Sequence, residues 1–168
     1  FLIPAITMRS IAEENRTGTI ELLLTKPISD LSIILAKYFA SITLVFLALL
    51  PTLIYYYSVV ELGEPKGNID HAGTLGAYFG LFLLGAVFVS IGIFASSLTK
   101  NQVIAFLIAV LLCFIVYIGF QFMATTLDAP FDLLFINLSI QEHYLGMQKG
   151  VIDSRDLIYY LSVITLFI

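Results

Sequence analysis

The strongest constraint on this chain is a set of three long stretches that contain no charged residue. They cover residues 38–60, 74–97 and 103–123, and they are 23, 24 and 21 residues long. A helix needs about 20 apolar residues to cross the ~30 Å hydrocarbon core of a bilayer, so each stretch is long enough to span it. The pattern predicts an all-α fold, a polytopic transmembrane helical bundle. Pro51 lies inside the first stretch and predicts a kink there.

The composition excludes several classes of protein. Of the 168 residues, 60% are hydrophobic and 12% are charged, whereas about 25% of the residues of a soluble domain are charged. Too few charges are present to cover the surface of a water-soluble domain. The single Cys113 excludes a disulfide framework, and the net charge of −4 argues against a nucleic-acid partner.

The distribution of Lys and Arg predicts the orientation of the spans. Residues 9–37 and 98–102 hold five of the eight basic residues, so both segments are expected on the cytoplasmic side. Residues 124–156 then form a long outer segment. Residues 1–8 and 157–168 are apolar but too short to span, and we interpret them as the end of one span and the start of another. The simplest interpretation is a fragment of a six-span protein, truncated at both ends, in which the three long stretches are spans 3, 4 and 5.

The sequence contains no motif of a self-contained enzyme. It has no phosphate-binding G-x-x-x-x-G-K-[ST], no H-E-x-x-H and no G-x-S-x-G. The long stretches also have no Asp, Glu, Lys, Arg or His, which an ion-coupled carrier needs within its spans. Asp70, His71, Glu142 and His143 form a conceivable metal site. We prefer to interpret them as solvated loop residues, and we expect no bound metal.

Residues 9–37, which we call the elbow, have strong local signals. Ser10 and Glu13 match a capping box, so a helix is expected to begin there. Gly18 is expected to end that helix, and a second short helix is expected over residues 19–25. Pro27 is expected to end this second helix. Either Ser29 or Asp30 is expected to cap the next one.

The charges of the elbow indicate what it contacts. Three carboxylates, Glu13, Glu14 and Glu21, stand beside Arg16 and Lys26. An amphipathic segment that only anchors a loop in the lipid interface usually has a basic polar face. The mixed charges favour docking to a protein partner, with lipid anchoring as the alternative.

The elbow also carries a resemblance to a known family. The run from Met8 to Asp30 resembles the E-E-x-x-x-G-T-x-E-L-L-x-x-x-P element of ABC-2 type transporter permeases, most closely the gliding-motility-associated branch. The stretch from His143 to Leu157 resembles the segment before the last span of the same permeases. The resemblance implies a bacterial inner-membrane permease with six spans that pairs with a second permease subunit and with separate ATPase subunits.

That resemblance implies that the permease and its partner ATPase have different roles. The permease would not be an enzyme, because ATP and Mg would be bound and ATP hydrolysed on the partner ATPase. The elbow would be the coupling segment that docks on the ATPase and transmits its motion to the spans. The alternative is a membrane scaffold that transports nothing. The residues that carry over to the coupling element are Glu13, Glu14, Arg16, Gly18, Thr19, Glu21, Leu22, Leu23, Leu24 and Pro27.

Two further sets of residues are candidates for functional roles. In the outer segment, Gly150 is expected to end a helix and Asp153 to cap the last one. The apolar part of this segment either closes the exit of the transport path or packs passively at the interface. Small residues four positions apart in residues 74–97 allow close helix packing, inside one subunit, between subunits or at the translocation seam. The gate candidates are Phe131, Leu134 and Phe135, and the helix-packing candidates are Gly76, Gly80 and Gly92.

Overall fold

The computed structural model describes residues 1–25, 28–64, 69–126 and 131–168, without the side chains of 22–24 and 131–133. Every regular element in these ranges is helical, which confirms the all-α fold class. In chain order the elements are α1 (Leu2–Thr7), α2 (Ala12–Thr17), α3 (Thr19–Leu24), α4 (Asp30–Leu49), the 3₁₀ turn η1 (Leu50–Thr52), α5 (Leu53–Leu62), α6 (His71–Ser97), α7 (Gln102–Phe114), the π-helical turn η2 (Ile115–Gly119), α8 (Phe120–Thr126), α9 (Phe131–Leu138), α10 (Ile140–Gln148) and α11 (Ser154–Phe167).

Three continuous helical stretches in the described part of the chain are long and apolar enough to cross a membrane. They are Asp30–Leu62, His71–Ser97 and Gln102–Thr126, with 33, 27 and 25 residues. The first is interrupted by η1, where the ring of Pro51 removes a backbone donor. The hydroxyl of Thr52 donates to the Leu49 carbonyl at 2.6 Å, so a side chain bonds a carbonyl at this break.

Helix α6 is the centre of the bundle. Of the 18 most apolar consecutive residues of α6, 67% are buried inside the protein, against 17% for the corresponding residues of each of the other two spanning stretches. A Cβ atom on Gly76 would lie 2.2 Å from the Met147 carbonyl oxygen of α10, and one on Gly92 would lie 2.0 Å from the Thr7 hydroxyl of α1. A Cβ on Gly80 would lie 3.0 Å from the ring of Tyr144. The candidate packing glycines therefore lie against other helices of the same chain.

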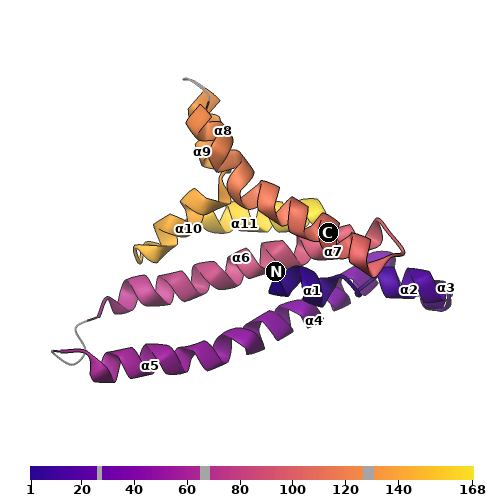
Figure 1. Cartoon of the computed structure of the whole chain (residues 1–168), viewed down its shortest axis with the longest axis horizontal. Helices are drawn as coiled ribbons and strands as arrows, with labels where there is room; N and C mark the ends of the chain where they lie inside the picture. The colour runs from indigo at the N-terminus through magenta and orange to yellow at the C-terminus, as the bar shows by residue number, and fades with distance from the viewer. Residues whose placement is uncertain (26–27, 65–68, 127–130) are drawn as a thin grey trace.

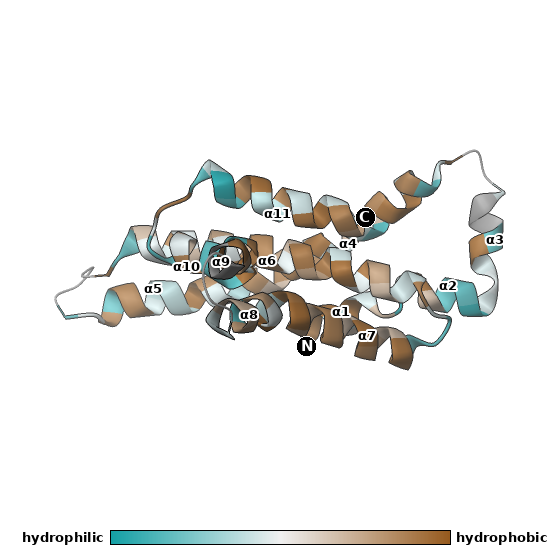
Figure 2. Cartoon of the chain, turned by 90° about the horizontal axis from the view of Figure 1, so that it is seen from above, coloured by the Kyte–Doolittle hydropathy of each residue, from teal (hydrophilic) through white to brown (hydrophobic). Residues whose placement is uncertain are grey.

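Several connections between helices lie at two opposite ends of the bundle. Both views place α2, α3 and the α6–α7 turn at one end, and the α5–α6 and α10–α11 connections at the other (Figures 1 and 2). Hydrophilic residues gather near these ends, and apolar residues dominate the helices between them (Figure 2). The elbow and residues 98–102 thus share one end, as the Lys and Arg pattern predicts.

The segment expected outside, residues 124–156, holds the end of α8, all of α9 and α10, and the start of α11. Helices α8 and α9 pack side by side and project away from the body of the bundle (Figure 1), whereas α10 packs along α6. Gly150 has a φ of +76° directly after α10, and the Asp153 carboxylate accepts from the Arg155 backbone N–H at 3.1 Å at the start of α11. Both local predictions are confirmed. The same hydrogen bond lowers the pKa of the Asp153 carboxyl.

Replacing Gly76 by Ala tests the packing of α6 on α10. The new methyl group would meet a backbone carbonyl, so we expect a loss of about 1–3 kcal/mol of stability from overpacking. Thermal unfolding of the purified protein in detergent measures this. The control is Gly146→Ala in α10, where the nearest atom would be 3.8 Å from the new Cβ. Equal melting temperatures for the two variants would contradict the packing described above.

Candidate functional site in the elbow

The elbow folds as two short helices joined by one left-handed residue. Helix α2 ends at Gly18, whose φ of +74° is readily adopted by glycine and rarely by other residues. Helix α3 follows at once over Thr19–Leu24. The hydroxyls of Thr17 and Thr19 lie 3.0 Å apart across this turn. The predicted helix end and the second short helix are therefore confirmed.

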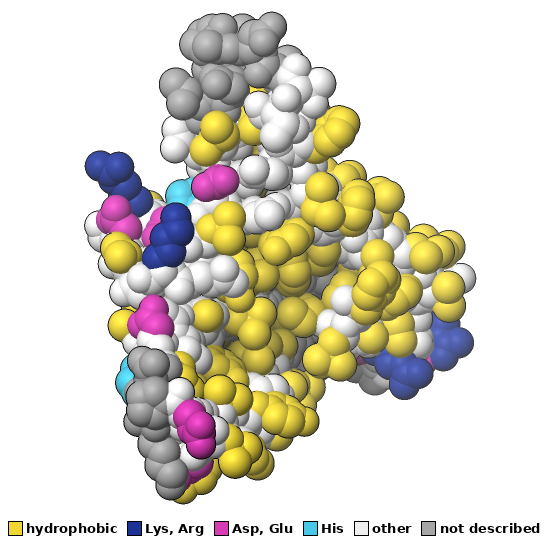
Figure 3. Space-filling model, turned by 60° about the vertical axis from the view of Figure 1, so that its left-hand side comes forward, with side chains coloured by type: hydrophobic (Ala, Val, Ile, Leu, Met, Phe, Trp, Pro, Cys, Tyr) yellow, Lys and Arg dark blue, Asp and Glu magenta, His cyan; other side chains and the backbone are white. Residues whose placement is uncertain are grey.

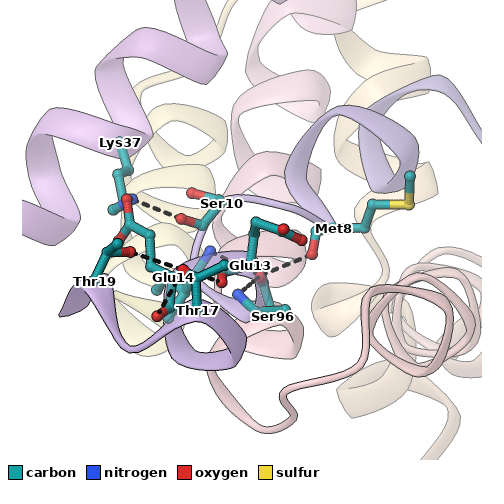
Figure 4. Close-up of polar contacts among 10 residues, drawn as sticks. Met8, Ser10, Glu13, Glu14, Thr17, Thr19, Lys37 and Ser96 are labelled. Atoms are coloured by element: carbon teal, nitrogen blue, oxygen red, sulfur yellow. Dashed lines mark hydrogen bonds and ion pairs between the residues drawn. The ribbon is translucent and has the colours of Figure 1, made fainter.

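The predicted capping box at the start of α2 is wrong. The helix begins one residue later than Ser10 would require, after Ile11, and no side chain of the elbow itself caps it. Instead, the Ser96 hydroxyl of α6 accepts from the backbone N–H groups of Ile11 at 3.0 Å and Ala12 at 2.9 Å, and donates to the Met8 carbonyl at 3.1 Å (Figure 4). One hydroxyl has one proton and two lone pairs, so these three bonds use its full capacity.

A second contact joins α2 and the residues just before it to α4. The Lys37 ammonium donates to the Glu14 carboxylate and to the Ser10 carbonyl, each at 2.6 Å (Figure 4). The two charged side chains are only 19% and 27% exposed. Glu14, which we expected to face a protein partner, is therefore engaged inside the chain. Ser29 occupies the N-cap position of α4 as expected, but its hydroxyl contacts that of Ser32 rather than a backbone N–H.

The remaining predicted coupling residues lie toward solvent or outside the described side chains. Arg16 pairs with Glu13 at 2.6 Å on the surface of α2. The second oxygen of Glu13 is buried with no hydrogen-bond partner among the described residues. Glu21 of α3 is exposed, so its carboxylate can meet a partner. The side chains of Leu22, Leu23 and Leu24, and all of Pro27, lie outside the described residues.

The gate candidates lie in α9. Leu134 is exposed, and the Phe135 ring stacks on Phe120 of α8 at a centroid distance of 6.4 Å. The side chain of Phe131 lies outside the described residues. The structure thus brings one of the three candidates into contact with the neighbouring helix α8.

The histidine residues do not form a metal site in the described part of the chain. Asp70 caps α6 by accepting from the Gly73 N–H at 2.9 Å, and the adjacent His71 bonds the Tyr56 hydroxyl. The interpretation of His143 as a solvated loop residue is wrong, because it lies in α10 and its side chain is 17% exposed. Sequence patterns gave no signal for the contacts of His143 with Asn137 and Asp156, because these residues lie 6 and 13 positions away in the sequence.

His143 joins three segments of the chain. Its Nδ1 lies 2.6 Å from an Asp156 carboxylate oxygen, and its Nε2 lies 3.0 Å from the Asn137 carbonyl oxygen. The Tyr159 ring stacks on the imidazole at 4.1 Å. This cluster links α10, α11 and the end of α9.

Comparison with known proteins assigns the chain to a family. The family model described as "ABC-2 family transporter protein" matches residues 1–166. The chain belongs to the ABC-2 transporter family. No curated protein and no solved structure gives a significant match. As a member of this family it is a multi-pass membrane component of an ABC transporter, a permease that is typically not itself catalytic.

An apolar cavity of about 460 Å³ lies in this ABC-2 protein among α1, α4, α6 and α7. No charged side chain lines it. Figure 3 shows that hydrophobic side chains cover a hollowed face of the molecule. A cavity of this kind accepts apolar groups and excludes ions.

Replacing Ser96 by Ala tests the contact between α6 and the elbow. Two buried N–H groups would lose their acceptor, which costs about 1–3 kcal/mol and corresponds to roughly 5- to 150-fold faster amide exchange. Hydrogen exchange at Ile11 and Ala12 measures this change. The control is Ser97→Ala, because the exposed Ser97 hydroxyl bonds only the Phe94 carbonyl of its own helix. Unchanged exchange in the Ser96 variant would refute the capping role.

Proposed function

We propose that this ABC-2 protein couples a separate ABC ATPase to the movement of a substrate across the membrane, and that the elbow is its docking surface. The observation that carries the proposal is the set of hydrogen bonds that join the first part of the elbow, around α2, to two spanning helices. Ser96 of α6 bonds the start of α2, and Lys37 of α4 bonds Glu14 within α2. A displacement of α2 by a docked partner is therefore transmitted to both spans.

The surface of the elbow supports docking to protein. Lys37 pairs with one oxygen of the Glu14 carboxylate, which leaves Glu21 exposed and the Glu13–Arg16 pair on the surface of α2. Opposite charges at the rim of an interface guide the correct partner and fix its register. ATP and Mg would be bound by the ATPase, since the sequence of this chain has no phosphate-binding motif. A second permease subunit would complete the transporter.

Three finer points belong to the same proposal. The E-E-x-x-x-G-T-x-E-L-L-x-x-x-P element supports the gliding-motility-associated branch of the family. The Lys and Arg excess around the elbow supports a cytoplasmic location for that end in a bacterial inner membrane. The apolar cavity and the uncharged spans favour a lipidic or amphiphilic substrate.

Charge reversal at Glu21 tests the docking surface. Glu21→Lys replaces an attraction by a repulsion, so we expect at least about tenfold weaker binding of the cognate ATPase, which corresponds to ~1.4 kcal/mol. Co-purification and ATPase-driven transport in reconstituted vesicles measure the effect. The control is Glu142→Lys, which makes the same charge change on the exposed face of α10. Normal ATPase binding and transport in the Glu21 variant would refute the docking role of this surface.

Cysteine labelling tests the sidedness. Glu64 and Lys100 lie in connections at opposite ends of the bundle, and the natural Cys113 is buried. In intact cells a membrane-impermeant maleimide should label Glu64→Cys, whereas Lys100→Cys should react only after the membrane is opened. Labelling of both positions from the same side would overturn the proposed topology.

A further inference from the structure

A basic cleft lies beside the elbow. It is an open cleft of about 810 Å³ between α2 and the α6–α7 turn, and Arg9, Arg16 and Lys100 line it. Thr99 and Gln102 add polar side chains to the same wall. Lys and Arg side chains lie in two separate places on the face shown in Figure 3, and one of these groups lies beside an apolar surface.

The charges in the basic cleft are only partly balanced. Glu13 is the one acidic residue in its lining, and it pairs with Arg16. Arg9 and Lys100 are exposed and make no ion pair within the described part of the chain. The cleft therefore has an excess of positive charge and free donors for an anion.

The position of the cleft indicates where that anion comes from. Lys100 lies in the short turn between two spanning helices, after Ser97 and before Gln102. The ends of two spans define the level of the bilayer where lipid phosphates lie. Arg9 follows α1 and faces the same cleft, so both free cations lie at headgroup depth.

An apolar path leads from the cleft along α7. Val103 lines the cleft, and Leu107 and Leu111 follow it one and two turns later on the same helix face. These three side chains are 65%, 60% and 59% exposed. A lipid whose phosphate occupied the cleft could lay an acyl chain along this stripe. A soluble acidic partner that bound only in the cleft would leave this apolar stripe uncovered.

We propose that the basic cleft binds the phosphate of an anionic phospholipid, with Arg9 and Lys100 as the main contacts and the exposed stripe of α7 against the acyl chain. Because the cleft has α2 as one wall and the α6–α7 turn as the other, the bound lipid contacts both the elbow and the spans. The cleft shares the Glu13–Arg16 pair with the proposed docking surface, but Arg9 and Lys100 are not part of that surface.

The test compares two double variants of the whole chain in phosphatidylcholine vesicles that contain spin-labelled phosphatidylglycerol. Arg9→Gln with Lys100→Gln removes the free cations of the cleft. Lys149→Gln with Arg155→Gln removes two exposed cations at the opposite end. Electron paramagnetic resonance measures the motionally restricted lipid. Each basic residue beside an anionic leaflet strengthens binding about fivefold, so we expect about 30-fold weaker association for the first pair and little change for the second.

Further measurements decide between the possible ligands. Circular dichroism checks that the variants are folded, and Lys100→Gln alone should weaken lipid association about fivefold. Equal lipid loss in both double variants, or no loss in the cleft variant, would overturn the proposal. Displacement of the labelled lipid by inorganic phosphate would indicate a general anion site instead. Unchanged lipid binding with lost ATPase binding would assign the cleft to the protein partner.

Discussion

The close approach of helices to α6 is the constraint on which the rest of the structure depends. Helices in a bilayer gain little hydrophobic free energy from associating, because lipid is as apolar as their own side chains. Association then relies on van der Waals packing, which improves when small residues let backbones approach. The Met147 carbonyl of α10 and the Thr7 side chain of α1 occupy the space that a Cβ would fill on Gly76 and Gly92. α6 is accordingly the most buried spanning helix.

The same helix connects the two polar ends of the molecule. Its last turn carries Ser96, which binds the start of the elbow, and its first half carries the glycines that face α10. A single rigid element therefore contacts both the elbow and the outer segment. In a transporter this arrangement lets an event at one membrane surface reach the other without a flexible connection. The Lys37–Glu14 pair adds a parallel link through α4.

Charge placement separates internal contacts from surfaces that remain open. Half-buried charges beside an apolar body are costly unless they are paired. Glu14 with Lys37 meets that requirement inside the chain, and the buried Asp156 carboxylate is hydrogen-bonded to His143. Glu21, Arg9 and Lys100 stay exposed. The first of these belongs to the proposed ATPase surface, and the other two to the proposed lipid site.

The sequence by itself determined the features that depend on neighbouring residues. Uncharged stretches long enough for a bilayer predicted the spanning helices, and the turn at Gly18 and the cap at Asp153 follow from local backbone geometry. Only the tertiary structure decided which side chain accepts hydrogen bonds from the free backbone N–H groups at the start of α2. Ser10 has the right residue type and spacing for a cap, but Ser96, 85 residues from Ile11, provides it. A hydrogen bond depends on distance in space, and only the packing of α6 against α1 brings these atoms together.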